Sequence, residues 1–186
     1  MLTDCSDKIK IIIVIPVYNH GSTLRGVVTR ALKVNDQVMV VDDGSTDGGI
    51  DTLNGLSVHM VRHSQNLGKG SAILTAAKAA RRLGMTHMIT IDADAQHDPS
   101  DVRHFIPVMQ ADPFAIVIGK RNFRKIHAPL SARFGRRFSN FWFRLQTGQA
   151  LADTQSGFRG YPLAALEKLK LREKHYAFEV EVLVKA

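Results

Sequence analysis

The sequence contains a single cysteine, Cys5, in a chain of 186 residues. No disulfide can form within the chain, which excludes the small secreted folds stabilised by disulfides and favours a reducing compartment. A long hydrophobic run is also missing, because the longest run covers only residues 11–17, whereas a membrane span needs roughly 20 residues. The first ten residues are polar and lack the apolar centre of a signal peptide. The sequence therefore predicts a cytoplasmic protein.

The composition is that of a globular protein with one core. Apolar residues make up 45% of the chain and charged residues 23%, so we expect a single domain over residues 1–186. Residues 178–186 form an apolar, periodic pattern with no capping residue after it, which raises the alternative of a domain truncated at its C-terminus. The net charge of +8 favours anionic partners, or serves solubility alone. Neither a zinc-ligand spacing nor an aromatic RNA-binding motif is present, so we expect no nucleic-acid partner.

Short β-branched runs alternate with helical patterns along the chain. The predicted strands cover residues 11–15, 37–41, 57–62, 86–91 and 114–118. The predicted helices cover residues 23–32, 70–83, 99–110 and 130–145, with Gly84 ending the second and Pro99 beginning the third. This alternation predicts an α/β fold with an open, mostly parallel sheet.

Polar side chains follow three of the predicted strands directly. Asp42 and Asp43 follow the second strand, Asp92 and Asp94 the fourth, and residues 119–121 the fifth. Ligands of open α/β sheets bind at the carboxyl ends of the strands. We therefore interpret the three clusters as parts of one site.

The segment from Asp92 to Gln96 predicts a metal site. Two carboxylates separated by one residue, with an amide nearby, offer the oxygen ligands that Mg²⁺ and Mn²⁺ prefer. A cation held there could bridge a diphosphate and stabilise its charge as it leaves. The alternative is a solvated turn.

Two further segments favour nucleotide binding. Asp42 and Asp43 could accept hydrogen bonds from a base or a ribose; the alternative is a turn with a helix cap from Ser45 or Asp47. Lys69 lies in a Gly-rich turn before a helix, which is typical of an anion site. It departs from the Walker A pattern because Gly70 follows it, and the alternative is a solvated charge.

Residues 133–145 combine Phe and Trp at helical spacing with four arginines. This pattern is typical of a helix that lies on a membrane surface or contacts phosphate. The alternative is a core-facing aromatic stripe with solvated arginines. Residues 153–159 form a polar loop between two apolar segments, a typical place for functional residues.

Five segments together resemble the family 2 glycosyltransferases. They cover residues 14–19, 40–47, 66–70, 92–96 and 153–159. The resemblance is greatest to the polyprenyl-phosphate branch, which includes the dolichyl-phosphate mannose and glucose synthases. It implies the GT-A fold, a Rossmann-like, mostly parallel sheet with helices on both faces. It also implies an inverting transfer of a hexose from a UDP- or GDP-sugar to a polyprenyl phosphate, on the inner face of the cytoplasmic membrane.

The resemblance also implies the roles of individual residues. The nucleotide sugar would contact Pro16, Tyr18, Asp42, Asp43, Lys69 and Asp92. The divalent cation, Mg²⁺ or Mn²⁺, would be held by Asp92, Asp94 and Gln96. The acceptor phosphate would contact Arg121 and Arg137, and the transfer point would be lined by Asp153, Gln155 and Asp94.

Three alternatives remain on the sequence alone. If the acceptor is a hydroxyl of a saccharide rather than a lipid phosphate, a carboxylate such as Asp153 must accept its proton. A non-catalytic nucleotide-sugar-binding module would keep the pocket without the transfer. A nucleotidyltransferase is disfavoured, because such enzymes carry a Gly-rich, basic loop after the first strand and residues 16–19 (Pro-Val-Tyr-Asn) follow it here.

Overall fold

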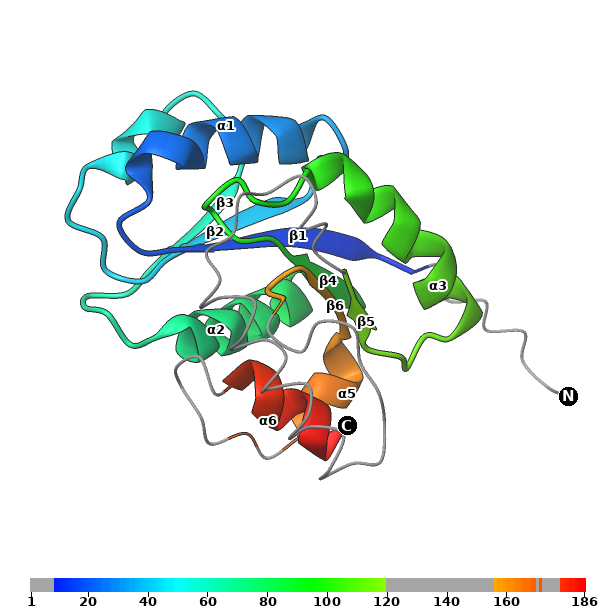
Figure 1. The fold of residues 1–186 in the computed structure, drawn as a ribbon. Helices are drawn as coiled ribbons and strands as arrows, with labels where there is room; N and C mark the ends of the chain where they lie inside the picture. Colours follow the sequence, from blue (N-terminus) through cyan, green and yellow to red (C-terminus); the bar gives the residue numbers. More distant parts are fainter. Residues whose placement is uncertain (1–8, 120–155, 170, 172–177) are drawn as a thin grey trace, which may run out of the picture.

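The computed structural model describes residues 9–119, 156–169, 171 and 178–186, which build one six-stranded sheet. The strand order is β3-β2-β1-β4-β6-β5 (Figure 1). The strands are β1 (Ile11–Val17), β2 (Val38–Asp42), β3 (His59–Arg62), β4 (His87–Thr90), β5 (Val117–Ile118) and β6 (Arg159–Pro162). Strands β1 to β4 pair in parallel, and β6 runs antiparallel between β4 and β5. The predicted α/β fold with a mostly parallel sheet is confirmed.

Helices cover both faces of the sheet (Figure 1). The α-helices are α1 (Gly21–Leu32), α2 (Lys69–Arg82), α3 (Phe105–Ala111), α5 (Leu163–Lys168) and α6 (Phe178–Lys185), and the 3₁₀ helices are η1 (Gly49–Leu53) and η2 (Pro99–His104). The core on one face joins α1 with η2 and α3, and the core on the other joins α2 with α5 and α6. Of the helices in these described segments, none is long and apolar enough to cross a membrane.

The sequence of strand β1 is an unbroken apolar run because both of its faces are buried. Successive side chains of a strand point to opposite faces. Ile13 and Ile15 enter the core beneath α1, whereas Ile12 and Val14 enter the core beneath α2. All four are fully buried, as expected for a strand whose two faces are both covered by helices.

The fifth predicted strand is shorter than expected. We expected a buried strand over residues 114–118, but β5 contains only Val117–Ile118 and Phe114 is 73% exposed. Asp112 causes the difference, because its carboxylate accepts a hydrogen bond from the Phe114 amide at 3.0 Å and its carbonyl accepts one from the Ala115 amide at 3.2 Å. These bonds form a turn where a strand was predicted.

Strand β6 was not predicted. Its sequence, Arg-Gly-Tyr-Pro, contains residues that are poor in strands, and its first residue was read as part of a loop. All four residues are buried, and the backbone of β6 pairs with both β4 and β5. Pairing with two neighbours therefore overrides the local preference.

The helix predicted over residues 99–110 is divided into η2 and α3. Asp98 caps η2 by accepting a hydrogen bond from the Ser100 amide, and Pro99 is its first residue, as predicted. Pro107 lacks an amide hydrogen and cannot sit in a helix interior. The α-helix therefore starts at Phe105, which places Pro107 in the first turn, where no intrahelical donor is needed.

Candidate active site

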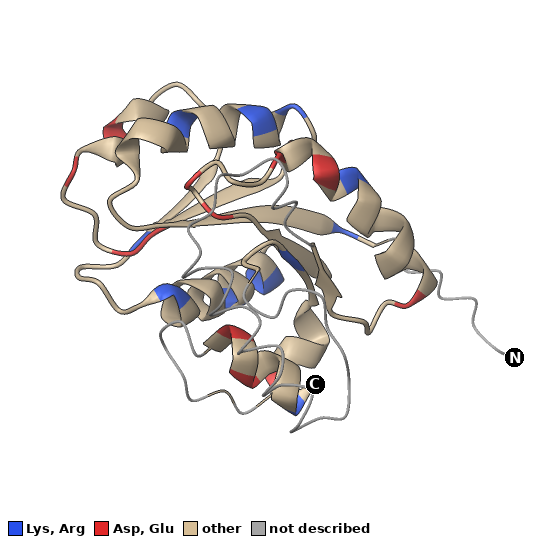
Figure 2. Cartoon of the chain, viewed as in Figure 1, with Lys and Arg blue, Asp and Glu red and all other residues tan. Residues whose placement is uncertain are grey.

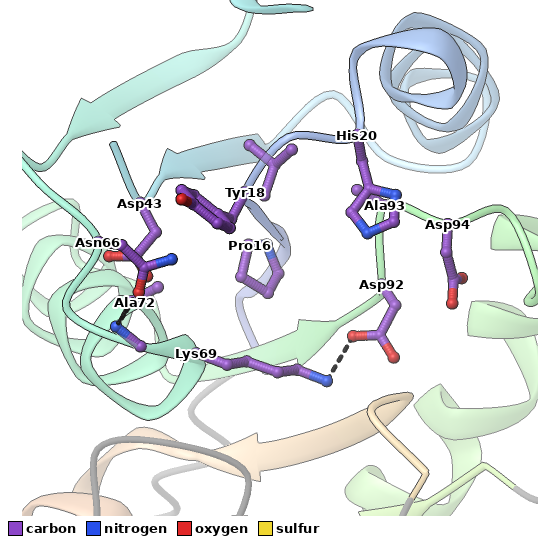
Figure 3. A pocket seen from close by; sticks show the side chains of 12 residues that line it. Pro16, Tyr18, His20, Asp43, Asn66, Lys69, Ala72, Asp92, Ala93 and Asp94 are labelled. Atoms are coloured by element: carbon purple, nitrogen blue, oxygen red, sulfur yellow. Dashed lines mark hydrogen bonds and ion pairs between the residues drawn. The ribbon is translucent and has the colours of Figure 1, made fainter. Parts of the chain in front are cut away.

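A cavity of about 260 Å³ lies at the carboxyl ends of β1, β2 and β4 (Figure 3). Six residues that the sequence assigns to the site line it: Pro16, Tyr18, Asp43, Lys69, Asp92 and Asp94. The expectation that polar clusters after different strands meet at one edge of the sheet holds for the clusters after β2 and β4. His20 and Asn66 also line the cavity. Neither was assigned to the site from the sequence, although Asn66 begins the matching segment 66–70.

The loops after β1 and β2 are joined by hydrogen bonds. The Asn19 amide donates to the Ser45 hydroxyl at 3.0 Å, and the Thr46 amide donates to the Asn19 side chain at 2.9 Å. Asn19 adopts a φ of 54°, a left-handed conformation that Asn tolerates better than most residues. This arrangement holds the neighbouring Tyr18 at the cavity with 45% of its surface exposed, so its ring is available to stack on a base.

Asp43 connects β2 to the start of α2. Its carboxylate accepts hydrogen bonds from the Leu67 amide at 2.9 Å, the Gly68 amide at 2.8 Å and the His63 ring at 2.6 Å. The His63 ring also bonds the Thr75 hydroxyl on α2 at 3.0 Å. Asp43 therefore fixes the loop before Lys69 while its side chain remains at the cavity wall.

Asp42 has a local structural role. It is fully buried, its carboxylate accepts from the Ser45 amide at 2.8 Å, and it forms an ion pair with Arg62 at 2.9 Å. Asp42 does not line the cavity. The turn role considered for this segment is present, and a nucleotide contact of Asp42 stays a prediction.

Lys69 lies at the cavity floor between two carboxylates. Its Nζ is 2.6 Å from Asp92 Oδ1 and 2.7 Å from Glu179 Oε1, and Figure 3 shows the Lys69 chain reaching along the floor to Asp92. Burial opposes the charged form of Lys69, but the charges of Asp92 and Glu179 outweigh it and raise the pKa of Lys69 above its ordinary value of 10.5. Lys69 is therefore an ammonium at neutral pH, not the solvated loop charge of the alternative interpretation.

Glu179 is a site residue that the sequence did not identify. It lies on α6, its side chain is only 7% exposed, and it pairs with Lys69. The backbone carbonyl of Glu179 accepts a hydrogen bond from the fully buried Arg159 at 2.6 Å. The available signal was an acidic residue inside the apolar pattern of residues 178–186, but that pattern does not say what the residue meets.

Gly157 lies directly against this group of charges. A Cβ atom at Gly157 would overlap both the Asp92 carboxylate and the Lys69 ammonium. The Gly157 carbonyl accepts a hydrogen bond from the Thr90 hydroxyl at 2.7 Å, which attaches this segment to β4. The glycine of the fifth motif therefore permits the close approach of the loop to the Lys69–Asp92 pair.

The segment after β4 presents two carboxylates to the cavity. The Ala93 carbonyl accepts a hydrogen bond from the Thr23 hydroxyl of α1 at 2.6 Å, and the Asp94 carboxylate accepts one from the backbone N–H of Gln96 at 3.0 Å. Asp92 and Asp94 line the cavity, whereas Gln96 is exposed and does not. A role for Gln96 as a metal ligand stays a prediction.

The oxygen donors at this position fit a divalent cation of the Mg²⁺ or Mn²⁺ type. Such a cation is commonly held by one or two carboxylates and completes its coordination with water and substrate phosphates. Asp92 is 26% exposed and faces the cavity beside Asp94. Among the described residues, no group of three or more His, Cys, Asp or Glu side chains could hold a metal. Asp92 and Asp94 are the carboxylates that this part of the chain brings to the cavity.

Four of the expected site residues lie outside the described part of the chain. They are Arg121 and Arg137, expected at the acceptor phosphate, and Asp153 and Gln155, expected at the transfer point. The helix expected over residues 130–145 lies in the same segment. These assignments stay predictions.

Residues 12–170 match the family described as glycosyl transferase family 2. The chain is 32% identical to the UDP-N-acetylglucosamine–dolichyl-phosphate N-acetylglucosaminyltransferase of Methanococcus voltae, with 96% of this chain and 80% of the relative aligned. It is 27% identical to the polyprenol monophosphomannose synthase of Mycolicibacterium smegmatis, with 94% of this chain and 71% of the relative aligned.

Solved structures show the same fold. The glucosyl-3-phosphoglycerate synthase from Mycobacterium tuberculosis, in complex with Mn²⁺, UDP and glucosyl-3-phosphoglycerate, aligns with a TM-score of 0.74 and 20% identity. The alignment covers 95% of this chain and 64% of that one, so the present chain spans slightly less than two thirds of the solved structure. The likeness confirms the expected GT-A architecture.

Proposed function

The chain belongs to glycosyl transferase family 2, and on this basis we propose that it transfers a hexose from a nucleoside-diphosphate sugar to a polyprenyl phosphate. The observation that carries the proposal is the cavity at the carboxyl ends of the strands. It combines an exposed aromatic ring at Tyr18 with an ammonium at Lys69 and two carboxylates at Asp92 and Asp94. These groups match, in order, the base, the diphosphate and the cation of such a donor.

The residues of the cavity perform separate tasks in this reaction. Tyr18 and Pro16 hold the base by stacking and apolar contact, and Asp43 accepts a hydrogen bond from it. Lys69 binds the diphosphate. Asp92 and Asp94 would hold a divalent cation, which neutralises the negative charge of the leaving diphosphate. Because the donor is held at several points, the anomeric carbon is presented to the acceptor in one orientation, which favours an in-line displacement with inversion.

A lipid phosphate as acceptor is supported by the relatives and by the charge distribution. Both named relatives act on, or make, polyprenyl-linked phosphates according to their names. Residues 120–144 contain eight Lys and Arg and no Asp or Glu. The charge of this segment, +8, equals the net charge of the whole chain. We assign the acceptor phosphate to this segment, with Arg121 and Arg137 as its contacts, and place the enzyme peripherally on the inner face of the cytoplasmic membrane.

The acceptor determines whether the enzyme needs a base. A phosphate is already an anion at neutral pH and can attack without losing a proton, whereas a hydroxyl acceptor needs a carboxylate such as Asp153. With a lipid phosphate, Asp153→Asn retains turnover within about tenfold of the original enzyme. A loss of several orders of magnitude, with nucleotide affinity intact, would instead support a hydroxyl acceptor.

The function is tested by donor binding followed by transfer. Thermal shift with UDP-, GDP- and dTDP-sugars, with and without Mn²⁺ or Mg²⁺, identifies the donor, and we expect a stabilisation that requires the cation. Transfer of the labelled sugar to dolichyl phosphate or undecaprenyl phosphate then identifies the acceptor. Stabilisation by a donor without transfer to any acceptor would favour the non-catalytic binding module. No shift with any donor in the presence of either cation would refute the proposal.

A further inference from the structure

Glu179 is not among the residues assigned to the donor, the cation or the acceptor. Its carboxylate lies 2.7 Å from Lys69 Nζ, which is also 2.6 Å from Asp92. The Lys69 ammonium thus pairs with two carboxylates from different parts of the fold: Asp92 lies in the segment after β4, and Glu179 lies on α6. The three side chains together carry a net negative charge.

The two carboxylates differ in what else they can reach. Asp92 is 26% exposed and lines the cavity, whereas the side chain of Glu179 is only 7% exposed and lies behind Lys69. Asp92 can therefore exchange Lys69 for a cation that enters from the cavity. Glu179 is too buried for such an exchange, and a buried carboxylate that loses its positive partner is strongly destabilised.

The surroundings fix Glu179 and limit the movement of Lys69. Arg159 donates to the Glu179 carbonyl at 2.6 Å and to the Ser156 carbonyl at 2.7 Å, which attaches α6 to the loop beside the site. Gly157 lies in contact with the Lys69–Asp92 pair, so that even one added carbon would overlap both. Within the described part of the chain, the open space next to the Lys69 side chain is the cavity that it lines.

We propose that Glu179 is a positioning residue that retains Lys69 at the cavity floor while Lys69 changes partner from Asp92 to the donor diphosphate. This inference rests on the proposed function. When Lys69 is paired with Asp92, its ammonium competes with a divalent cation for that carboxylate. When the diphosphate takes Lys69, Asp92 becomes available, so cation and nucleotide bind cooperatively. By linkage, each ligand raises the affinity for the other by the same factor.

The test compares Glu179→Gln with Glu181→Gln. Glu181 lies on the same helix and pairs with Lys185 at 2.6 Å, so its substitution removes the same charge away from Lys69. Two affinities are measured for each folded protein. The first is that for Mn²⁺ alone, from the electron paramagnetic resonance signal of free Mn²⁺. The second is that for UDP or GDP, whichever the original protein binds more tightly, by calorimetry at saturating Mn²⁺.

We expect Glu179→Gln to weaken nucleotide binding by about tenfold, because Lys69 is no longer retained in place. We also expect it to weaken the binding of Mn²⁺ alone, because Asp92 is then the remaining carboxylate partner of Lys69. Glu181→Gln should leave both affinities within about twofold of the original. A purely electrostatic role predicts the opposite result for the nucleotide, since removal of a negative charge strengthens the binding of an anion. A purely structural role lowers the melting temperature and leaves both affinities unchanged.

Lys69→Met keeps the proposal testable if Glu179→Gln does not fold. It removes the competitor for Asp92, so Mn²⁺ alone should bind more tightly than to the original protein, while the nucleotide binds more weakly. Unchanged or weaker binding of Mn²⁺ alone would overturn the inference. If the original protein binds neither UDP nor GDP with Mn²⁺ present, the proposed function fails and the inference with it. If it binds one of them and Glu179→Gln binds it equally well, the inference alone fails.

Discussion

Gly157 shows how closely the candidate site is packed at the level of single residues. The backbone of Gly157 does not adopt a positive φ, so its conformation does not require glycine. The residue is constrained by its neighbours, because a Cβ would overlap Lys69 and Asp92. The atoms that it would meet are the ends of side chains, which can move aside at low cost. The glycine is therefore needed for the ion pair rather than for the backbone.

Gly157→Ala is expected to displace both the Lys69 ammonium, which would bind the diphosphate, and the Asp92 carboxylate, which would hold the cation, while the fold persists. The free energy of unfolding should fall by about 1 kcal/mol, whereas nucleotide affinity in the presence of Mn²⁺ should fall by about tenfold. Urea unfolding and calorimetry measure the two effects. Gly26→Ala on α1 is the control, because a Cβ there meets open space and alanine favours a helix. Equal nucleotide affinity in both variants would contradict the role of Gly157.

At the scale of elements, the site depends on how β2 is joined to α2. Asp43 at the end of β2 accepts hydrogen bonds from two backbone amides of the loop that precedes Lys69. The position of the Lys69 backbone is therefore set from the neighbouring strand. The same carboxylate is expected to contact the base, so one residue links the two halves of the donor site.

Asp43→Asn is expected to destabilise this junction. The carboxylate of Asp43 accepts hydrogen bonds from two backbone amides and the His63 ring. In asparagine, one carboxylate oxygen is replaced by an NH₂ group, which cannot accept a hydrogen bond. At least one buried donor would then lose its acceptor, which costs about 1–3 kcal/mol. Urea unfolding measures this loss. Asp51→Asn on η1, an exposed position, removes the same charge and should change the free energy of unfolding by less than about 0.5 kcal/mol. A similar loss in both variants would assign the effect to net charge.

His87 joins β4 to the turn before β5, at the end of β4 away from the site. Its ring bonds the Pro113 carbonyl and the Thr86 hydroxyl, each at 2.9 Å. Burial lowers the pKa of His87 below its ordinary value of 6.5, and the bond to Pro113 only partly opposes this. The unfolded chain therefore binds a proton at a higher pH than the folded protein does.

This difference makes the fold sensitive to acid. The contribution of neutral His87 is present above pH 6.5 and is lost as the pH falls from there toward the lower pKa of the folded state. His87→Gln should lose less unfolding free energy between about pH 7 and about pH 5 than the original protein. His104→Gln, whose side chain is 67% exposed, should match the original. Chemical unfolding at each pH provides the comparison, and an equal loss in all three proteins would exclude His87 as the cause.

At the scale of the whole molecule, the excess positive charge belongs to one segment. Figure 2 shows Lys and Arg spread over helices on both faces of the sheet in the described part of the chain. The sequence places eight basic residues and no acidic ones in residues 120–144. This concentration favours contact with an anionic membrane, where each basic residue near the surface contributes about 1 kcal/mol.

Substitution of Arg133, Arg136 and Arg137 by Gln is expected to weaken binding to vesicles that contain phosphatidylglycerol by about a hundredfold. The binding of the original protein should also decrease with added salt. The control replaces Lys33, Lys78 and Arg82, three exposed residues of the α1 and α2 region, and so removes the same charge elsewhere. Cosedimentation measures both. If the two triple variants bind equally, net charge rather than this segment mediates the contact.

The sequence by itself determined the α/β architecture and identified six of the residues that line the candidate site. Apolar runs for β1, β2 and β4 are local signals. The two Asp pairs lie at the ends of β2 and β4, so their meeting at one sheet edge is a consequence of parallel strands. The sequence also located α2, which ends at Arg82. Gly84 follows its C-cap with a φ of 74°, in the position predicted for a C-terminal stop.

Only the tertiary structure decided what these local elements meet. The pairing of β6 between β4 and β5 depends on neighbours that are distant in sequence, and nothing in Arg-Gly-Tyr-Pro indicates it. The same holds for Glu179, whose partner Lys69 lies in the other half of the chain. A buried charge is defined by the group that compensates it, and periodicity carries no information about that group. The donor site could therefore be predicted as a set of residues, whereas the sharing of Lys69 between Asp92 and Glu179 required the folded chain.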